Sequence, residues 1–408
     1  MATPKPLSGA VRFGALLLLL LAGPSAPAAV SVGPSDSVQV GGFFSQGYLV
    51  NDGPNNYLGE TSDGTADFRE YAVSASWAKG KWRIGAQGFG QKLGLYGGDE
   101  AKLDWAVVDY QHAQWLGVRA GRVKSPRGLY NEALDVDAVR PFVLLPQSVY
   151  DARLRDFNAA FNGGMLYGNI GLGRAGTVDY RAFYGEIPMS IESGASDYFN
   201  NDIPFPNVAI GMDSAHGGTV FWNTPATGLR VGYSYSGFRD FTALRVVVVP
   251  GFSATLYKSA PTYHRHLASV EYTTGDWTFA AEAGIEKATY DIGIPGLPPT
   301  NRLDFEADYF YVSAARRMKS WLELGAYVSY SHERSTLRTS AAVTIPSLVQ
   351  ADYALSARFD VNENVLFKVE AHYMDGSGKL FDTPRARQPV AGRDNSWLLF
   401  AAKTTLSF

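Results

Sequence analysis

Alternation between apolar and polar residues, with a period of two, runs through almost the whole chain after residue 30. In residues 365–374, Phe367 and Val369 share one side of an extended strand. Lys368 and Glu370 share the opposite side, and helical periodicity is nearly absent from the rest of the chain. The pattern therefore predicts a protein built almost entirely from β-strands, each with one apolar and one polar face.

The lengths of the connections restrict the fold further. The predicted strands cover residues 38–49, 67–77, 80–90, 102–111, 115–122, 158–171, 177–185, 216–223, 229–237, 264–272, 277–288, 305–316, 321–332, 351–360, 365–374 and 395–408. Short links alternate strictly with long ones, as in a transmembrane barrel whose turns at one end only reverse the chain. A soluble β-sandwich has no reason to sort its loops in this way. We therefore predict an all-β fold, a transmembrane antiparallel β-barrel of about 16 strands.

The composition agrees with a wall that faces lipid on one side and water on the other. The chain holds 43 glycines, which ease the bending of a curved sheet. Aromatic residues make up 13% of it, and Trp82, Trp321 and Trp397 fall near predicted strand ends, where an interfacial girdle belongs. A net charge of −3 argues against a nucleic-acid partner. The absence of cysteine excludes disulfides, thiolate metal sites and a cysteine nucleophile.

The first 28 residues have the pattern of a secretory signal peptide. Lys5 and Arg12 form a basic region, residues 16–21 lie in a short apolar stretch, and Ala26-Pro27-Ala28 matches a cleavage site. The apolar stretch is too short to span a bilayer as a helix. We therefore predict a signal peptide at residues 1–28 and a barrel at residues 29–408.

A ring of about sixteen strands encloses a lumen too wide for wall side chains to fill, which predicts a water-filled channel. The longest connection, residues 123–157, contains five cations and five anions, so its charges balance. Its apolar segment, residues 141–149, either packs against the inner wall or covers a subunit interface. The candidate pore-lining residues are Lys124, Arg127, Glu132, Asp135, Asp137, Arg140, Arg153 and Arg155 of this connection and Arg83, Arg119, Arg181, Arg230, Arg358 and Lys368 of the wall.

The chain from residue 29 onward resembles a bacterial outer-membrane porin. Its terminal Leu406-Ser407-Phe408 resembles the closing strand of that class, whose final Phe is read by the barrel-assembly machinery. A second, local resemblance joins Gly121–Leu129 to a Gly-x-x-Lys-x-Pro-aromatic-Gly stretch of phosphate-selective O/P-type porins. Arg127 stands where that family has an aromatic residue, so this sequence departs from the pattern there.

The resemblance to porins implies a location and partners. The protein is expected in the Gram-negative cell outer membrane, among its lipids, with both termini in the periplasm. The resemblance also implies that the third long loop, residues 123–157, folds inward as a constriction loop. It further implies contact of Phe408 with the assembly machinery, assembly as a homotrimer, and small hydrophilic solutes as the cargo.

Three functional classes remain open. The first is passive diffusion of small hydrophilic solutes and ions, with an anion- or phosphate-selective channel as the alternative. A dedicated anion channel needs an uncompensated basic ring, and the charge balance of residues 123–157 argues against one. The second class is a non-conducting barrel for adhesion or anchoring, whose lumen would be filled by loops. The third is a secreted, soluble β-protein that binds carbohydrate.

The sequence contains no pattern that assembles a reaction. His-Glu-x-x-His, Gly-x-Ser-x-Gly and Walker patterns do not occur. His264 and His266 share a strand face, but no third histidine or carboxylate stands beside them, so a metal site is not expected. We expect a protein without catalytic residues and without a cofactor.

Overall fold

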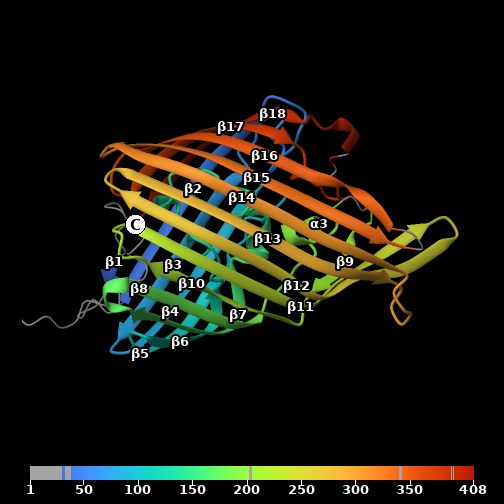
Figure 1. Cartoon of the computed structure of the whole chain (residues 1–408). Coiled ribbons are helices and arrows are strands. Elements are labelled where there is room, and N and C mark those ends of the chain that lie inside the picture. The colour runs from blue at the N-terminus through green and yellow to red at the C-terminus, as the bar shows by residue number, and fades with distance from the viewer. Residues whose placement is uncertain (1–29, 33–37, 202–204, 340–341, 387, 389) are drawn as a thin grey trace, which may run out of the picture.

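Sixteen of the strands in the described part of the chain form a closed antiparallel barrel, shown in Figure 1. This computed structural model describes residues 30–32, 38–201, 205–339, 342–386, 388 and 390–408. The predicted signal peptide, residues 1–28, lies outside the described residues. The predicted all-β fold and the number of wall strands are confirmed.

The wall strands occupy the positions that the alternation indicates. They are β2 (Val38–Asn51), β3 (Phe68–Lys79), β4 (Trp82–Leu93), β5 (Lys102–Ala113), β6 (Leu116–Lys124), β7 (Ala160–Gly171), β8 (Thr177–Glu186), β10 (Ser214–Asn223), β11 (Leu229–Val249), β12 (Phe252–Thr274), β13 (Trp277–Gly293), β14 (Asn301–Lys319), β15 (Leu322–Arg338), β16 (Ala342–Asp360), β17 (Val365–Gly376) and β18 (Ser396–Ser407). Two shorter strands are β1 (Val30–Val32), which pairs with β2, and β9 (Asn207–Gly211), which pairs with β11.

Helices occur only as short segments within the described connections. The α-helices are α2 (Arg155–Asn158) and α3 (Gly194–Phe199), and the 3-10 turns are η1 (Asn131–Ala133), η2 (Asp137–Val139), η3 (Ala152–Leu154), η4 (Gly173–Ala175) and η5 (Val390–Gly392). None of the helices in the described residues has the length and apolarity needed to cross a membrane.

The last strand closes the barrel onto the first wall strand. β18 pairs with β2 from Leu399↔Asn51 to Ser407↔Phe43. Beyond the strand end, the backbone N–H of Phe408 donates to the carbonyl of Gly42 at 3.0 Å, and the N–H of Gly42 donates back at 3.0 Å. This closure leaves no open edge between β18 and β2, as a sheet surrounded by lipid requires.

The wall is taller on one side. Strands β11 to β16 contain 17 to 23 residues, whereas the other wall strands contain 9 to 14. The sequence assigns residues 238–263, 289–304 and 333–350 to long links, and this assignment is wrong, because most of these residues continue the strands. Alternation persists there, with charged outward side chains that pair across strands, such as Lys287 with Glu306 at 2.9 Å.

The two faces of the wall divide as the alternation predicts. Exposed apolar side chains cover the outer face, and exposed Trp82 and Trp321 lie at the end with the short turns. Trp397 does not belong to this girdle: it is buried and packs against Tyr57, with ring centroids 5.6 Å apart. Trp397 shares the parity of Lys403, so it faces inward.

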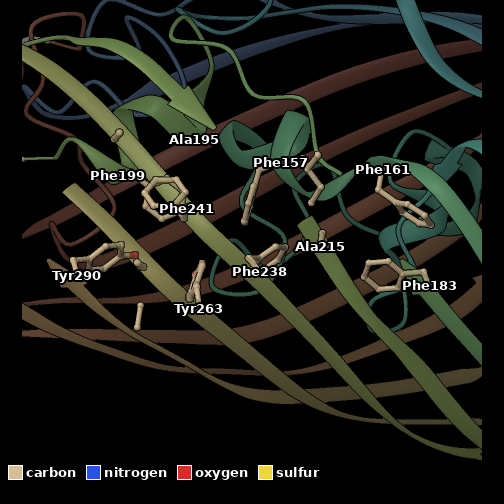
Figure 2. Packing of buried hydrophobic residues seen from close by; sticks show 14 of the residues in the cluster. Phe157, Phe161, Phe183, Ala195, Phe199, Ala215, Phe238, Phe241, Tyr263 and Tyr290 are labelled. Carbon is tan, nitrogen blue, oxygen red and sulfur yellow. The ribbon is translucent and has the colours of Figure 1, made fainter. Parts of the chain in front are cut away.

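Several loops at the opposite end fold into the lumen rather than away from it. We number the long connections from the N-terminus, and four of them recur below: the first loop (residues 52–67), the third (125–159), the fourth (187–213) and the eighth (377–395). Figure 2 shows Phe157 of the third loop and Phe199 of the fourth loop packed among Phe238, Phe241 and Tyr263 of the wall. The core of the protein is therefore made by loops against the inner face of the barrel.

Candidate functional site

The third loop crosses the lumen. It leaves β6 and returns to β7, which are the fifth and sixth wall strands counted from β2. Its middle part contacts β16, β17 and β18, the fourteenth to sixteenth wall strands, on the far side of the ring. The predicted constriction loop therefore lies inside the barrel, although its first two residues, 123 and 124, belong to β6.

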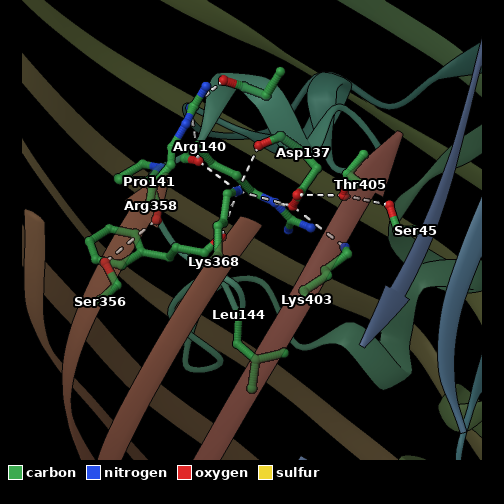
Figure 3. Close-up of polar contacts among 12 residues, drawn as sticks. Ser45, Asp137, Arg140, Pro141, Leu144, Ser356, Arg358, Lys368, Lys403 and Thr405 are labelled. Atoms are coloured by element: carbon green, nitrogen blue, oxygen red, sulfur yellow. Dashed lines mark hydrogen bonds and ion pairs between the residues drawn. The ribbon is translucent and has the colours of Figure 1, made fainter. Parts of the chain in front are cut away.

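Asp137 fixes the third loop to the far wall (Figure 3). Nζ of Lys368 lies 3.1 Å from Oδ1 of Asp137, and Nζ of Lys403 lies 3.5 Å from the same oxygen. Arg140 Nε approaches Oδ1 to 3.2 Å, and Thr405 Oγ1 donates to Oδ2 at 2.9 Å. Both lysines are almost fully buried, at 0% and 1% exposure. Charges buried this deeply persist only when they are paired and hydrogen-bonded, so loop and wall depend on each other.

Lys368 also holds the backbone of the loop. Its Nζ donates to the carbonyls of Asp137 at 2.7 Å, Arg140 at 2.8 Å and Phe142 at 3.2 Å. Arg358 on the neighbouring strand donates to another loop carbonyl at 2.5 Å. Irregular backbone needs partners for its carbonyls, and two wall cations supply them here.

The charges around Asp137 keep it ionised. Burial alone raises the pKa of this carboxyl, but the positive charges of Lys368, Lys403 and Arg140 outweigh that effect and hold its pKa well below the ordinary range. Asp135 behaves similarly, because Lys124 and Arg155 overcome the effect of burial on its pKa. Both loop carboxylates therefore stay charged at neutral pH.

The near side of the loop is held by Asp104 of β5. Nζ of Lys124 lies 3.2 Å and Nη2 of Arg155 lies 2.7 Å from its carboxylate. Lys124 also pairs with Asp135, and Gln87 donates to Asp104 at 3.1 Å. The carboxylate of Asp104 thus ties both the end of β6, from which the loop leaves, and the returning part of the loop to β5.

A third attachment lies at Glu282 of β13. Its Oε1 accepts from the N–H of Leu129 at 3.0 Å, and Tyr150 donates to Oε2. Gly128 has φ of +57°, and a Cβ there would lie 2.5 Å from Oε1 of Glu282. Glycine is required at this position both by the left-handed backbone and by the close approach of the carboxylate.

The apolar segment of the third loop, residues 141–149, packs against the inner wall, which is the first of the two alternatives that the sequence left open. Phe142 lies 5.0 Å from Tyr327 between ring centroids, in an edge-on arrangement. The N–H of Leu144 donates to Glu370 at 2.8 Å, and Val143 and Leu145 are buried as well. Apolar packing and a charge-assisted hydrogen bond therefore reinforce the ionic attachment.

Open hollows lie beside the loop. One, with a cavity volume of about 50 Å³, lies against β3 and β4 and is lined by Phe68, Glu70, Gln91, Arg140, Leu144 and Arg155 among others. A second, of about 20 Å³, lies against β12 to β15 and is lined by Arg127, Tyr198, Arg265, Glu286, Tyr309 and Lys379 among others. Polar and apolar side chains share both linings.

The structure pairs most of the predicted pore-lining residues with opposite charges. Beyond the pairs already described, these are Arg119 with Asp109 (2.7 Å), Arg153 with Asp151 (2.6 Å), Arg181 with Glu132 (3.2 Å), Arg230 with Glu271 (2.7 Å) and Arg358 with Asp360 (2.8 Å). Arg83 and Arg127 have no carboxylate within 4.0 Å in the part of the chain that the structure describes. Arg127 donates instead to the carbonyl of Val149 at 2.8 Å and to the hydroxyl of Tyr309 at 3.3 Å.

Sequence reasoning missed several members of these networks. Asp104 and Asp109 on β5 both point inward, although strict alternation would place an even-numbered and an odd-numbered residue on opposite faces. The register between β4 and β5 shifts between Gln87 and Gly88, and this irregularity interrupts the alternation on β5. Glu70 and Lys403, which pair at 2.6 Å, do have the inward parity that could have identified them. Parity gives the face of a residue but not its height in the barrel.

His264 and His266 lie on the outer face of β12 beside tyrosines. Their Nδ1 atoms lie 2.8 Å from the hydroxyl of Tyr235 and 2.6 Å from that of Tyr233. Across the described residues, no three histidine or acidic side chains are arranged to hold a metal ion.

Three solved structures show which proteins share this fold. OmpT, an outer membrane protein of Vibrio cholerae, has a TM-score of 0.55 and 12% identity over 93% of this chain and 100% of that one. An anion-selective porin from Comamonas acidovorans has a TM-score of 0.51 and 13% identity over 91% of this chain and 99% of that one. The outer membrane channel DcaP of Acinetobacter baumannii has a TM-score of 0.51 and 9% identity over 93% and 99%.

Sequence comparison alone adds nothing to this result: no protein-family profile and no curated protein matches the chain. At identities of 9% to 13% the structural likeness establishes the fold. The chain therefore has the closed 16-stranded barrel fold of the outer-membrane porins, which the sequence resemblance predicts.

Proposed function

We propose that the protein is an outer-membrane porin that lets small hydrophilic solutes and ions diffuse through a water-filled lumen. The observation that carries this proposal is a third loop that crosses the lumen and is fastened to both sides of it, with an open hollow on each side. A loop anchored in this way narrows a wide barrel and holds the width of the passage constant.

The pairing of the lumen charges favours a general channel over an anion-specific one. A dedicated phosphate pore needs several fixed cations that remain free to replace the water around the anion. Here the cations of the third loop are mostly bound to carboxylates, and Lys368 and Lys403 are buried against Asp137.

The setting of the channel follows from the proposal. The outer apolar face would contact the lipids of a Gram-negative outer membrane, with the short turns and both termini in the periplasm and the long connections rooted at the extracellular end. Phe408, exposed at the closing strand, would meet the barrel-assembly machinery, and the protein would assemble as a homotrimer.

Reconstitution in a planar bilayer tests the proposal directly. We expect stepwise, ohmic conductance from folded protein and a reversal potential near zero in a salt gradient. Absence of any conductance from protein that is heat-modifiable, and hence folded, would overturn it. A strongly anion-selective reversal potential, together with block of chloride current by phosphate, would replace the general porin with the anion-selective alternative.

A further inference from the structure

The fourth and eighth loops meet although they are rooted on opposite sides of the barrel. Counted from β2, the fourth loop joins the seventh and eighth wall strands, and the eighth loop joins the fifteenth and sixteenth. Half of the ring therefore separates their roots in either direction. Two loops rooted in this way can touch only by reaching across the mouth of the barrel.

Asp197 of α3 and Arg385 of the eighth loop form the centre of this contact. Nη2 and Nε of Arg385 donate to Oδ2 of Asp197 at 2.8 and 3.1 Å, and Thr383 Oγ1 donates to Oδ1 at 3.2 Å. Arg385 also donates to the carbonyls of Glu192 and Ser193. Charge-assisted bonds of a guanidinium fix both the distance and the orientation of the two loops.

Further contacts follow the same line. The N–H of Asp382 donates to Oδ1 of Asn201 at 2.9 Å, and the rings of Tyr198 and Phe381 lie 6.0 Å apart between centroids. A hydrogen bond and an aromatic contact thus join the same two loops beside the central ion pair.

The third loop also contacts both of these loops through Arg153, which is only 5% exposed. Its guanidinium lies 3.8 Å from the ring centroid of Phe381 and 5.3 Å from that of Tyr57 in the first loop, and it donates to the carbonyl of Lys379. A Cβ at Gly194 would lie 2.1 Å from the carbonyl oxygen of Arg153, so α3 rests directly on the third loop. The first and eighth loops therefore meet at the guanidinium of Arg153, and the fourth loop lies against the backbone of the same residue.

We propose that the contact between the fourth and eighth loops is a bridge across the mouth that sets the upper size of solutes entering the channel, with Asp197 and Arg385 as its specificity-determining pair. The proposal rests on the channel function proposed above. It adds a second size filter, separate from the third loop: solutes must pass beside a bridge that divides the opening, whatever width the third loop leaves below it.

Arg385→Ala tests the bridge. Loss of its charge-assisted bonds shifts the ratio of open to bridged mouths by roughly tenfold or more. We expect the permeation of trisaccharides into proteoliposomes to rise by a similar factor, while that of monosaccharides changes little. Asp291→Ala is the matched control, because it removes the partner of Arg302 (3.0 Å) on the outer rim at the same end of the barrel. That variant should keep the wild-type size limit.

A reversible variant separates the bridge from any folding defect. The chain has no cysteine, so Asp197→Cys with Thr383→Cys introduces one possible disulfide between the two loops. Reduced, this double variant should pass trisaccharides like Arg385→Ala; oxidised, it should return to the wild-type limit on the same molecules.

The outcomes distinguish the two proposals. A conducting wild type whose size limit is unchanged by Arg385→Ala, and by reduction of the double variant, overturns the bridge and leaves the porin standing. A silent wild type with a conducting Arg385→Ala supports the bridge as a closed mouth. If both are silent although folded, both proposals fail.

Discussion

Lys368→Met removes the cation that fastens the middle of the third loop to the far wall. In the wild type, Nζ of Lys368 makes three hydrogen bonds to loop carbonyls, at 2.7 to 3.2 Å, and an ion pair with Asp137 at 3.1 Å. Methionine fills a similar volume but has no hydrogen-bond donor and no charge. The variant therefore leaves three loop carbonyls without this donor, and the buried carboxylate of Asp137 has one positive charge fewer beside it.

The structure sets the size of the effect. Each bond from a charged donor contributes about 1.5–3 kcal/mol, and desolvation of the ammonium offsets part of that sum. Removing one partner of a buried ion pair costs about 3–5 kcal/mol. We therefore expect the ratio of attached to detached loop to fall by roughly two to four powers of ten.

Hydrogen exchange of the folded protein in detergent, read by mass spectrometry, measures this ratio at residues 130–150. Faster exchange there, with unchanged exchange in β5 and β13, is the expected result, and single-channel current should become noisier. Lys287→Met is the control: Lys287 is 55% exposed on the outer rim and pairs with Glu306, and such a surface pair contributes only about 0–1 kcal/mol. If Lys368→Met exchanges as slowly as this control, the buried lysine does not hold the loop.

Three further predictions concern pH, charge and closure. Because the folded-state pKa of Asp137 is lowered, its stabilisation is complete above the ordinary carboxyl pKa of about 3.9 and is lost as the pH falls toward the lower value; the protection of the backbone around Asp137 against exchange, corrected for the intrinsic pH dependence of amide exchange, should therefore fall below about pH 4, and protection that stays unchanged down to about pH 2 would contradict the assignment. Arg127→Glu, which reverses the charge of a cation that lines one hollow without a carboxylate partner, should shift the reversal potential toward cations, and an unchanged potential would place that hollow outside the ion path. Deletion of Phe408 removes the two backbone hydrogen bonds with Gly42 and should lower the free energy of unfolding by about 1–3 kcal/mol in a urea titration of the folded barrel. An unchanged urea midpoint would show that the closure between β18 and β2 does not depend on these two bonds.

Alternation carried most of the fold because the wall is the part of the molecule in which each residue chooses only between two faces. It placed Arg358 and Lys368 on the lumen side, where the structure has them. Alternation also places Trp397 on the same face of its strand as the inward Lys403, which is where the structure has it. Its position near a strand end had instead led to the prediction that it belongs to the interfacial aromatic girdle.

The loops were harder to predict, because their partners are far away in sequence and depend on height in the barrel. Asp137 meets Lys368 across 231 residues, and no local pattern selects that lysine over another inward cation. Arg153 appeared as a pore-lining charge, but the rings of Phe381 and Tyr57 enclose it. The apolar pair Leu380 and Phe381 is a local sign in the sequence that part of the eighth loop is buried.

The attachment of the third loop also constrains the order in which the molecule can form. Asp137 precedes β7, but Lys368, Lys403 and Thr405, which hold it, belong to β17 and β18, the strands that close the barrel. Contacts between residues so distant in sequence form late, because the chain entropy of closing long loops must be lost before any of them is made. Until β17 and β18 are in place, Asp137 has none of these wall partners, and the interior cannot reach its final packing. Closure of β18 onto β2 and attachment of the third loop to the wall should therefore occur as one cooperative step at the end of folding.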